Sequence, residues 1–266
     1  MILDGKYLSN QIAADLSKRA AGRHAKLAVL LAGSDPASVK YVNAKRARAA
    51  EVEIACDIIK LPDDVSETEI LTIIEKLNKD DSTTGIMTQL PLPPHLDADK
   101  ITNAVDPDKD VDGLGRAGKY LPATVRGIER LLEYYLFGQN FDLDGRVAVI
   151  VGAGELAGKP AAKMLLRHGA TTIVCHDKTK DLRHWTRQAD ILIAAAGCKN
   201  LIQPGDIKEG VILIDVGCDA AKECYGKAAH YSPVPGGVGP MTIISLLENT
   251  IDAIPARQIK QPLPAP

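Results

Sequence analysis

Short apolar runs alternate with longer segments of helical period along most of the chain. In the first half, each run has the length of a buried parallel strand, and the segments between them have one apolar face. Ser66 and Glu69 have the spacing of a capping box, which predicts a helix start. The predicted strands are 27–31, 56–61 and 85–90, and the predicted helices are 8–23, 36–53 and 67–79.

The second half repeats this alternation. A helical pattern at 125–136 is followed by a turn at 142–145, and another helical pattern begins at Met241. The predicted strands are 147–151, 171–175, 191–196 and 211–216, with helices between the first three. Strands that alternate with helices over the whole length predict an α/β protein with parallel sheets.

Composition narrows the possible functions. The 266 residues include 45% apolar and 25% charged residues and carry a net charge of −2, which is typical of a globular enzyme and gives no basic surface for nucleic acid. There is no apolar run long enough for a membrane span and no secretory leader pattern. The five cysteines form no Cys-x-x-Cys pair and the six histidines have no metal-ligand spacing. We therefore expect reduced thiols, a cytoplasmic location and no metal site.

A glycine-rich turn directly follows the predicted strand 147–151. Gly152, Gly154 and Gly158 give the spacing Gly-x-Gly-x-x-x-Gly, one residue longer than the usual dinucleotide fingerprint, and a helical pattern follows. A strand, a glycine turn and a helix start place backbone N–H groups where a diphosphate binds. The sequence predicts a nucleotide site here, and a tight turn that binds nothing is the alternative.

Asp177 follows the next predicted strand, about where an NAD site has its ribose-binding acid. A carboxylate there accepts hydrogen bonds from the ribose 2′-OH and repels a 2′-phosphate. His176, Lys178 and Lys180 have the opposite effect, because cations at that edge hold a phosphate. The residues leave NAD and NADP open, and an ordinary loop acid is the alternative for Asp177.

Four further residues are candidates for chemistry. Tyr41 and Lys45 are four residues apart on one predicted helix face, a pattern that also arises from simple packing. Gln89 ends a predicted strand, on the side where open α/β sheets bind ligands. Asp112 lies in the short loop Lys109–Gly113, which could equally be an ordinary turn.

The segment 232–242 has three prolines and three glycines among its eleven residues. Proline fixes φ and removes a donor, whereas glycine permits positive φ and close approach of a ligand. The composition alone would also suit a rigid connection between domains. The order of its residues, Ser-Pro-Val-Pro-Gly-Gly-Val-Gly-Pro-Met-Thr, is more specific than its composition.

This segment closely resembles a loop of the bifunctional methylenetetrahydrofolate dehydrogenase/cyclohydrolase family. The resemblance extends over residues 2–254. The other matching motifs are Leu-Asp-Gly-Lys at 3–6, Gly-Ser-Asp-Pro-Ala-Ser at 33–38, Tyr-Val-Asn-Ala-Lys at 41–45, Gln-Leu-Pro-Leu-Pro at 89–93 and Lys-Asp-Val-Asp-Gly at 109–113. It implies two α/β domains flanking a cleft: a folate-binding catalytic domain of residues 1–121 with a C-terminal helix at 240–258, and a Rossmann-like, doubly wound NAD(P)-binding domain of residues 122–239.

The resemblance also implies roles. Lys45 would be the central group of the cyclohydrolase step, Gln89 would tune its protonation, Tyr41 would pack on the folate ring and Asp112 would bind the pterin edge. The implied activities are oxidation of 5,10-methylenetetrahydrofolate and hydrolysis of the methenyl product, in a cytoplasmic homodimer of one-carbon metabolism and purine biosynthesis that uses NADP by family default. The implied substrate contacts further include Pro235, Gly236 and Gly237, and the implied cofactor contacts are Gly152, Ala153, Gly154, Gly158, His176, Asp177, Lys178, Ala196, Gly197, Gly217, Pro235, Gly237 and Thr242.

The chain departs from the family pattern in several places. The loop after Gly113 is short and lacks the aromatic residue and histidine usual there, and the segment 218–230 is also shortened. Pro122-Ala123-Thr124-Val125 replaces Pro-Cys-Thr-Pro, Gly154 occupies a position that is usually serine, and Asp177 replaces a serine common in NADP-using members. Three alternatives stay open: a dehydrogenase with little hydrolase activity, a non-catalytic folate- or nucleotide-binding protein, and a dehydrogenase acting on an unrelated substrate.

Overall fold

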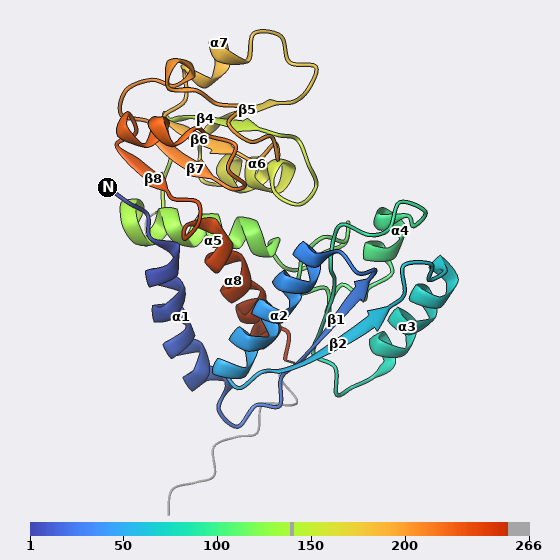
Figure 1. The fold of residues 1–266 in the computed structure, drawn as a ribbon. Helices are drawn as coiled ribbons and strands as arrows, with labels where there is room; N and C mark the ends of the chain where they lie inside the picture. The colour runs from blue at the N-terminus through green and yellow to red at the C-terminus, as the bar shows by residue number, and fades with distance from the viewer. Residues whose placement is uncertain (139–140, 255–266) are drawn as a thin grey trace, which may run out of the picture. The chain divides into compact units, whose positions relative to one another are not determined.

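A computed structural model describes residues 1–138 and 141–254. The chain divides into two compact units. The five-stranded unit comprises Met1–Asn10 and Thr124–Thr242, and the three-stranded unit comprises Gln11–Ala123 and the chain from Ile243. The division falls within α1 (Gly5–Ala20) and α8 (Val238–Asp252) and one residue into α5 (Ala123–Leu132), helices that are labelled in Figure 1.

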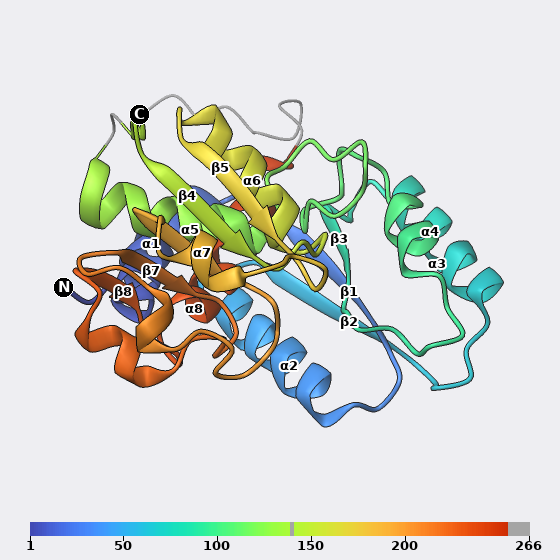
Figure 2. The same cartoon turned by 90° about the horizontal axis from the view of Figure 1, so that it is seen from above.

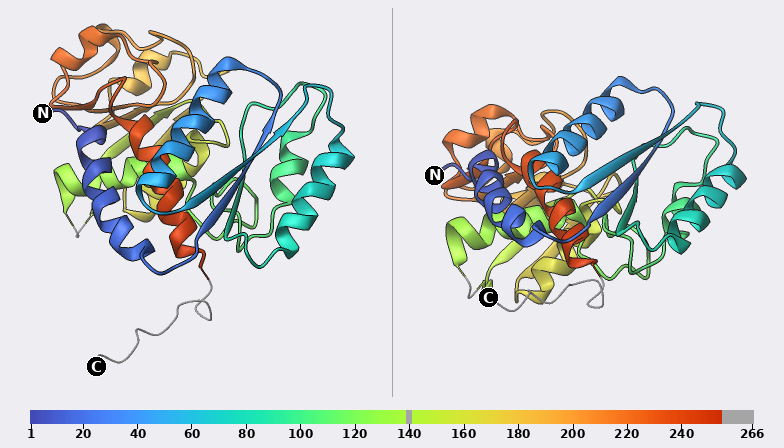
Figure 3. Two further views of the ribbon diagram at one scale, coloured as in Figure 1. Left: turned by 60° about the horizontal axis from the view of Figure 1, so that its bottom comes forward. Right: turned by 90° about the horizontal axis from the view of Figure 1, so that it is seen from below.

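The three-stranded unit has a parallel sheet in the order β2 (Ala55–Leu61), β1 (Lys26–Ala32), β3 (Gly85–Thr88). The chain steps from β1 to β2 in one direction and from β2 to β3 in the other. Right-handed crossovers therefore place their helices on opposite faces. Figure 3 shows α2 (Pro36–Glu51) on one side of the sheet, and α3 (Glu67–Lys79) and α4 (Ala98–Asn103) on the other.

The core of this unit lies between the sheet and the pair α3 and α4. Leu30 of β1 and Ile86 of β3 pack there against Ile70 and Ile74 of α3 and Ile101 of α4, all at most 1% exposed. α3 begins at the predicted residue because the Ser66 side chain accepts a hydrogen bond from the Glu69 N–H at 3.2 Å. The apolar face of α3 is thus buried against one face of the sheet.

The five-stranded unit has an all-parallel sheet in the order β5, β4, β6, β7, β8. The chain reverses direction between β4 and β6, which makes their carboxyl ends a topological switch point, the usual ligand site of such sheets. α6 (Gly158–Arg167) packs on β4 and β5 (Figure 2). The strands are β4 (Val147–Val151), β5 (Thr171–Cys175), β6 (Ile191–Ala194), β7 (Ile212–Asp215) and β8 (His230–Ser232).

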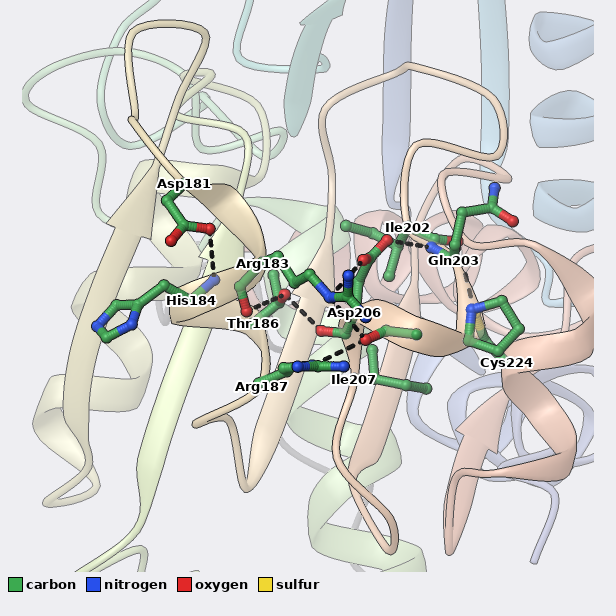
Figure 4. A network of polar contacts seen from close by, with 12 residues as sticks. Asp181, Arg183, His184, Thr186, Arg187, Ile202, Gln203, Asp206, Ile207 and Cys224 are labelled. Carbon is green, nitrogen blue, oxygen red and sulfur yellow. Dashed lines mark hydrogen bonds and ion pairs between the residues drawn. The ribbon is translucent and has the colours of Figure 1, made fainter.

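The short helix α7 (Leu182–Thr186), between β5 and β6, is tied by polar contacts to a 3-10 turn at Pro204–Asp206 (Figure 4). Arg187 donates from Nε to the Gly205 carbonyl at 2.8 Å, and the buried Thr186 hydroxyl donates to the Asp206 carbonyl. These bonds connect the crossover after β5 with the segment that leads into β7.

The predicted fold class is confirmed, because both units are α/β with parallel sheets. Several element bounds differ from the prediction. The strand expected at 85–90 ends at Thr88, and the helix expected at 125–136 divides into α5 (Ala123–Leu132) and a π-helical turn at Glu133–Phe137. Among the α-helices and strands of the described residues, α4 and β8 were not predicted, because each is too short to show a period.

The C-terminal helix begins at Val238 instead of Met241, since Pro240 fits the first helical turn, where its missing N–H has no intrahelical partner. It ends at Asp252, so the predicted extension to residue 258 lies partly outside the described residues. Within the described part of the chain, no helix is long and apolar enough to cross a membrane.

Candidate functional site

Two of the candidate chemical residues meet in the three-stranded unit. Lys45, on α2, is 7% exposed, and its Nζ donates a hydrogen bond to Oε1 of Gln89 at 2.8 Å. Gln89 directly follows β3, and its Nε2 donates to the Leu90 carbonyl at 2.6 Å, which sets the orientation of the amide. Burial lowers the pKa of Lys45, because the charged ammonium is poorly solvated there.

The start of α2 positions this lysine. Asp35 caps the helix by accepting a hydrogen bond from the Ser38 N–H at 2.7 Å, and Pro36 occupies the first turn. Ser38, Val42 and Lys45 then fall on the buried face. Tyr41 lies at the edge of that face and is 55% exposed, so its ring is accessible for stacking.

Asp112 is the electrostatic partner of Lys45. Burial raises the pKa of the Asp112 carboxyl to about 6, the positive charge of Lys45 opposes this rise, and the negative charge of Asp110 adds to it. In return, Asp112 raises the pKa of Lys45 against the effect of burial. A lysine with a lowered pKa that interacts with a carboxyl group of raised pKa is suited to move a proton.

Sequence reasoning missed two residues that hold the Asp112 loop. Asp110 is 4% exposed and accepts hydrogen bonds from the N–H groups of Gly113 at 3.0 Å and Gly115 at 2.8 Å. Asn249 of α8 is fully buried and donates from Nδ2 to the carbonyls of Val111 at 2.8 Å and Leu121 at 3.1 Å. Burial explains both contacts, because a buried polar side chain needs hydrogen-bond partners, but that burial is evident only from the folded structure.

The glycine turn lies in the five-stranded unit at the switch point. Gly152 has a φ of 113° and approaches the backbone of Ala195 so closely that a Cβ would collide with it. A Cβ on Gly158, the first residue of α6, would collide with the Gly152 carbonyl. Gly154 has nothing within 4 Å of an added Cβ. The turn, which includes Ala153, therefore brings backbone N–H groups and the start of a ten-residue helix together, and this cradle fits a diphosphate.

The candidate selectivity residues follow β5, the strand next to β4. His176 and Lys178 belong to a turn in which the His176 N–H donates to Oγ1 of Thr179 at 2.9 Å and the Lys178 N–H donates to Nδ1 of His176 at 3.1 Å. The Asp177 side chain is 86% exposed, and its Oδ1 lies 3.6 Å from Nδ1 of His176. The carboxylate is thus presented at the carboxyl edge of the sheet.

The remaining predicted contacts of this unit also follow strands at the same edge. Ala196 and Gly197 follow β6, Gly217 follows β7, and the segment 233–237 follows β8. Carboxyl ends of parallel strands share one edge, so the topology gathers these loops with the glycine turn.

The proline–glycine segment has a defined backbone. Gly236 has a φ of 110°, the Gly237 N–H donates to the Pro233 carbonyl at 2.7 Å, and the Lys6 N–H donates to the Gly236 carbonyl at 2.9 Å. Thr242 lies one turn into α8, where its hydroxyl donates to the Val238 carbonyl at 3.2 Å. The segment is thus a fixed turn between β8 and α8.

Comparison with known proteins gives matches to both parts of the chain. Residues 3–112 match the model of the tetrahydrofolate dehydrogenase/cyclohydrolase catalytic domain, and residues 122–258 match that of the NAD(P)-binding domain of the same family. The chain is 44% identical to the bifunctional protein FolD of Campylobacter jejuni, with 94% of this chain and 96% of that protein covered.

Solved structures agree with these matches. The crystal structure of the bifunctional dehydrogenase/cyclohydrolase FolD from Campylobacter jejuni is 41% identical, covers 96% of this chain and 98% of that one, and has a TM-score of 0.89. The FolD structure from Trypanosoma brucei, complexed with NADP and an inhibitor, is 29% identical, covers 98% and 99%, and has a TM-score of 0.88. The chain belongs to the bifunctional tetrahydrofolate dehydrogenase/cyclohydrolase family of one-carbon folate metabolism.

Proposed function

We propose that this chain carries out both reactions of its family with the residues described above. It oxidises 5,10-methylenetetrahydrofolate to the methenyl form with a nicotinamide dinucleotide, and hydrolyses that product to 10-formyltetrahydrofolate. The observation that carries the proposal is the buried hydrogen bond between Lys45 and Gln89, in a setting that lowers the pKa of the lysine.

Hydrolysis needs a group that accepts a proton from water and returns one to the departing ring nitrogen. A lysine with a lowered pKa has a neutral amine fraction that can accept the proton, and the ammonium so formed can return it. The Gln89 carbonyl oxygen accepts a hydrogen bond from Nζ and orients the amine. Asp112 and the exposed ring of Tyr41 would bind the pterin edge and ring face of the substrate, and Pro235, Gly236 and Gly237 would add substrate contacts.

The five-stranded unit would hold the dinucleotide. Gly152, Ala153, Gly154 and Gly158 would cradle the diphosphate, while His176, Asp177 and Lys178 would face the adenine-side ribose. Contacts would also come from Ala196, Gly197, Gly217, Pro235, Gly237 and Thr242. When bound, the nicotinamide supplies the hydride acceptor, and the chain contributes alignment of the two reactants.

The choice of dinucleotide follows from two opposed features. Resemblance to the family favours NADP, as does the basic character of His176 and Lys178. The exposed Asp177 carboxylate favours NAD, because it would repel a 2′-phosphate. We propose NADP as the family default and NAD as the alternative that Asp177 supports.

Family resemblance also supports an assignment of the parts. Residues 1–121 with the helix at 240–258 would form the folate-binding catalytic domain, and residues 122–239 the NAD(P)-binding domain. We further propose a cytoplasmic homodimer, assembled through the NAD(P)-binding domain, that supplies one-carbon units for purine biosynthesis. Light scattering of the purified protein tests the dimer.

A dehydrogenase with weak hydrolase activity is the second candidate. It is favoured by the short loop after Asp112, which Asp110 holds close to the backbone of residues 113–115. A paired assay separates the two candidates. The protein is given 5,10-methylenetetrahydrofolate with NAD or NADP, and the reduced nicotinamide and the methenyl product are followed together. Reduction without methenyl accumulation supports both activities, whereas accumulation that decays at the uncatalysed rate supports a dehydrogenase alone.

A further inference from the structure

Tyr225 occupies an unassigned position beside the proline–glycine segment. It lies in a short 3-10 helix, Lys222–Gly226, between β7 and β8, within the segment that is shortened relative to the family pattern. Its ring stacks on that of Tyr231 of β8, with centroids 4.4 Å apart and planes inclined by 10°. The stacking directs the Tyr225 hydroxyl to a fixed place between β7 and the segment 233–237.

The Tyr225 hydroxyl forms hydrogen bonds to two groups from different segments, the Asp215 carboxylate and the Val234 N–H. It donates to Oδ2 of Asp215, the last residue of β7, at 3.3 Å, and accepts from the Val234 N–H at 3.3 Å. Burial, together with the negative charge of Asp215, raises the pKa of Tyr225 to about 12. The hydroxyl therefore keeps its proton at neutral pH and can act as donor to Asp215 and acceptor from Val234 simultaneously.

Asp215 continues the connection to a second loop. It is fully buried, and its Oδ1 accepts a hydrogen bond from the Asp219 N–H at 2.9 Å. The carboxylate of Asp219, also fully buried, accepts from the Cys198 N–H, directly after Gly197. Hydrogen bonds thus run from the loop after β6, through Asp219, Asp215 and Tyr225, to Val234.

We propose that Tyr225 is a positioning residue for the dinucleotide: its hydroxyl, held by Asp215, fixes the backbone of 233–237 relative to the loop at 196–198. The inference rests on the proposed role of these two loops as cofactor contacts. The physical argument is that each of these loops has little regular structure of its own. A buried polar network with both ends bonded to backbone N–H groups restricts their conformations before the ligand binds, which reduces the ordering cost of binding.

The test uses Tyr225→Phe, which removes the hydroxyl and keeps the ring on Tyr231. Tyr231→Phe is the matched control, because it removes a hydroxyl from the other ring of the same stack, and that hydroxyl makes no hydrogen bond with the described residues. For each protein, the Kd of NAD and NADP is measured by calorimetry. Hydrogen–deuterium exchange of the peptide covering 232–237 is measured in parallel without ligand.

For Tyr225→Phe we expect the Kd of the preferred dinucleotide to rise by about threefold to tenfold, the usual effect of one lost hydrogen bond. The peptide at 232–237 should exchange faster, because the Val234 N–H loses its acceptor. Tyr231→Phe should leave both quantities within about twofold of the wild type. Asp215→Asn, which weakens the acceptor of the Tyr225 hydroxyl, should change both in the same direction as Tyr225→Phe.

Two results would overturn the inference. In the first, Tyr225→Phe changes neither the Kd of the dinucleotide nor the exchange of the peptide at 232–237. In the second, Tyr225→Phe and Tyr231→Phe weaken dinucleotide binding and speed exchange equally, which would indicate general loosening of the stacked rings. Failure of the proposed function is distinguishable, because it would appear as absence of dinucleotide binding in the wild type. In that case the exchange measurement still decides whether Tyr225 restrains the segment.

Discussion

Nζ of Lys45 lies 2.8 Å from Oε1 of Gln89, although the two residues are 44 positions apart and come from a helix and a strand end. Nε2 of the same Gln89 amide donates a hydrogen bond to the Leu90 carbonyl, so the amide cannot rotate freely. The arrangement presents an amine of lowered pKa in a fixed orientation, which is the requirement of a group that exchanges protons with substrate.

Replacement of the lysine tests this assignment directly. Lys45→Met keeps the length and burial of the side chain but removes the proton-carrying group, so methenyl hydrolysis should fall by roughly 10²–10⁴-fold. Lys40→Met, on an exposed position of the same helix, is the control and should retain the wild-type rate. Hydrolysis by Lys45→Met at the wild-type rate would show that another group carries the proton.

The pH dependence of hydrolysis follows from the Lys45–Asp112 pair. If neutral Lys45 is the base, kcat/KM should rise with pH, with a midpoint below the ordinary lysine value of 10.5, because burial lowers the pKa of Lys45. The negative charge of Asp112 raises that pKa, so Asp112→Asn should move the midpoint to lower pH.

The midpoint is the decisive readout for Asp112→Asn, since weaker pterin binding would raise KM without displacing the pH profile. A midpoint that stays in place, or moves to higher pH, would mean that Asp112 does not set the protonation of Lys45.

Cofactor selectivity depends on Asp177. Asp177→Ser removes a negative charge that would lie against a 2′-phosphate, so the ratio of kcat/KM for NADP to that for NAD should increase severalfold. Glu209→Gln removes an exposed negative charge from the opposite, amino-terminal side of β7 and should leave the ratio unchanged. Equal ratios in the wild type and Asp177→Ser would place this carboxylate away from the ribose.

The glycines of the nucleotide turn should differ in their tolerance of a side chain. Gly158→Ala would force a Cβ onto the Gly152 carbonyl, so the free energy of unfolding should decrease by about 1–3 kcal/mol and dinucleotide binding should weaken. Gly154→Ala meets no atom within 4 Å and should keep the wild-type Tm. Thermal unfolding and dinucleotide titration of the two variants check this pair, and equal Tm values would refute the packing argument.

Much of the fold was accessible from the pattern of apolar residues. Strands β4 and β5 were predicted to the residue, as was α3, because Gly152 follows β4, Gly169 lies two residues before β5 and Ser66 caps α3. The short elements α4 and β8 were not, since a three-residue strand and a six-residue helix contain less than two periods of their patterns.

Some residues of the candidate site could likewise be identified from the sequence, and others could not. Gly152 and Gly158 could be identified from their spacing after a strand, and Lys45, Gln89 and Asp112 from family resemblance. Asp110, Asn249 and the Asp215–Tyr225 pair could not, because no local pattern in a sequence shows which polar side chains become buried and hydrogen-bonded.

By itself the sequence determined the local structure of this protein: where strands and helices run, where the chain must turn, and which family it resembles. Those properties depend on period, capping and backbone freedom, which act over a few residues. Only the tertiary structure decided which polar groups are buried together, and hence the lowered pKa of Lys45 and the raised pKa of Asp112. Desolvation and hydrogen bonding depend on neighbours brought in by folding, and no single segment of the chain contains them.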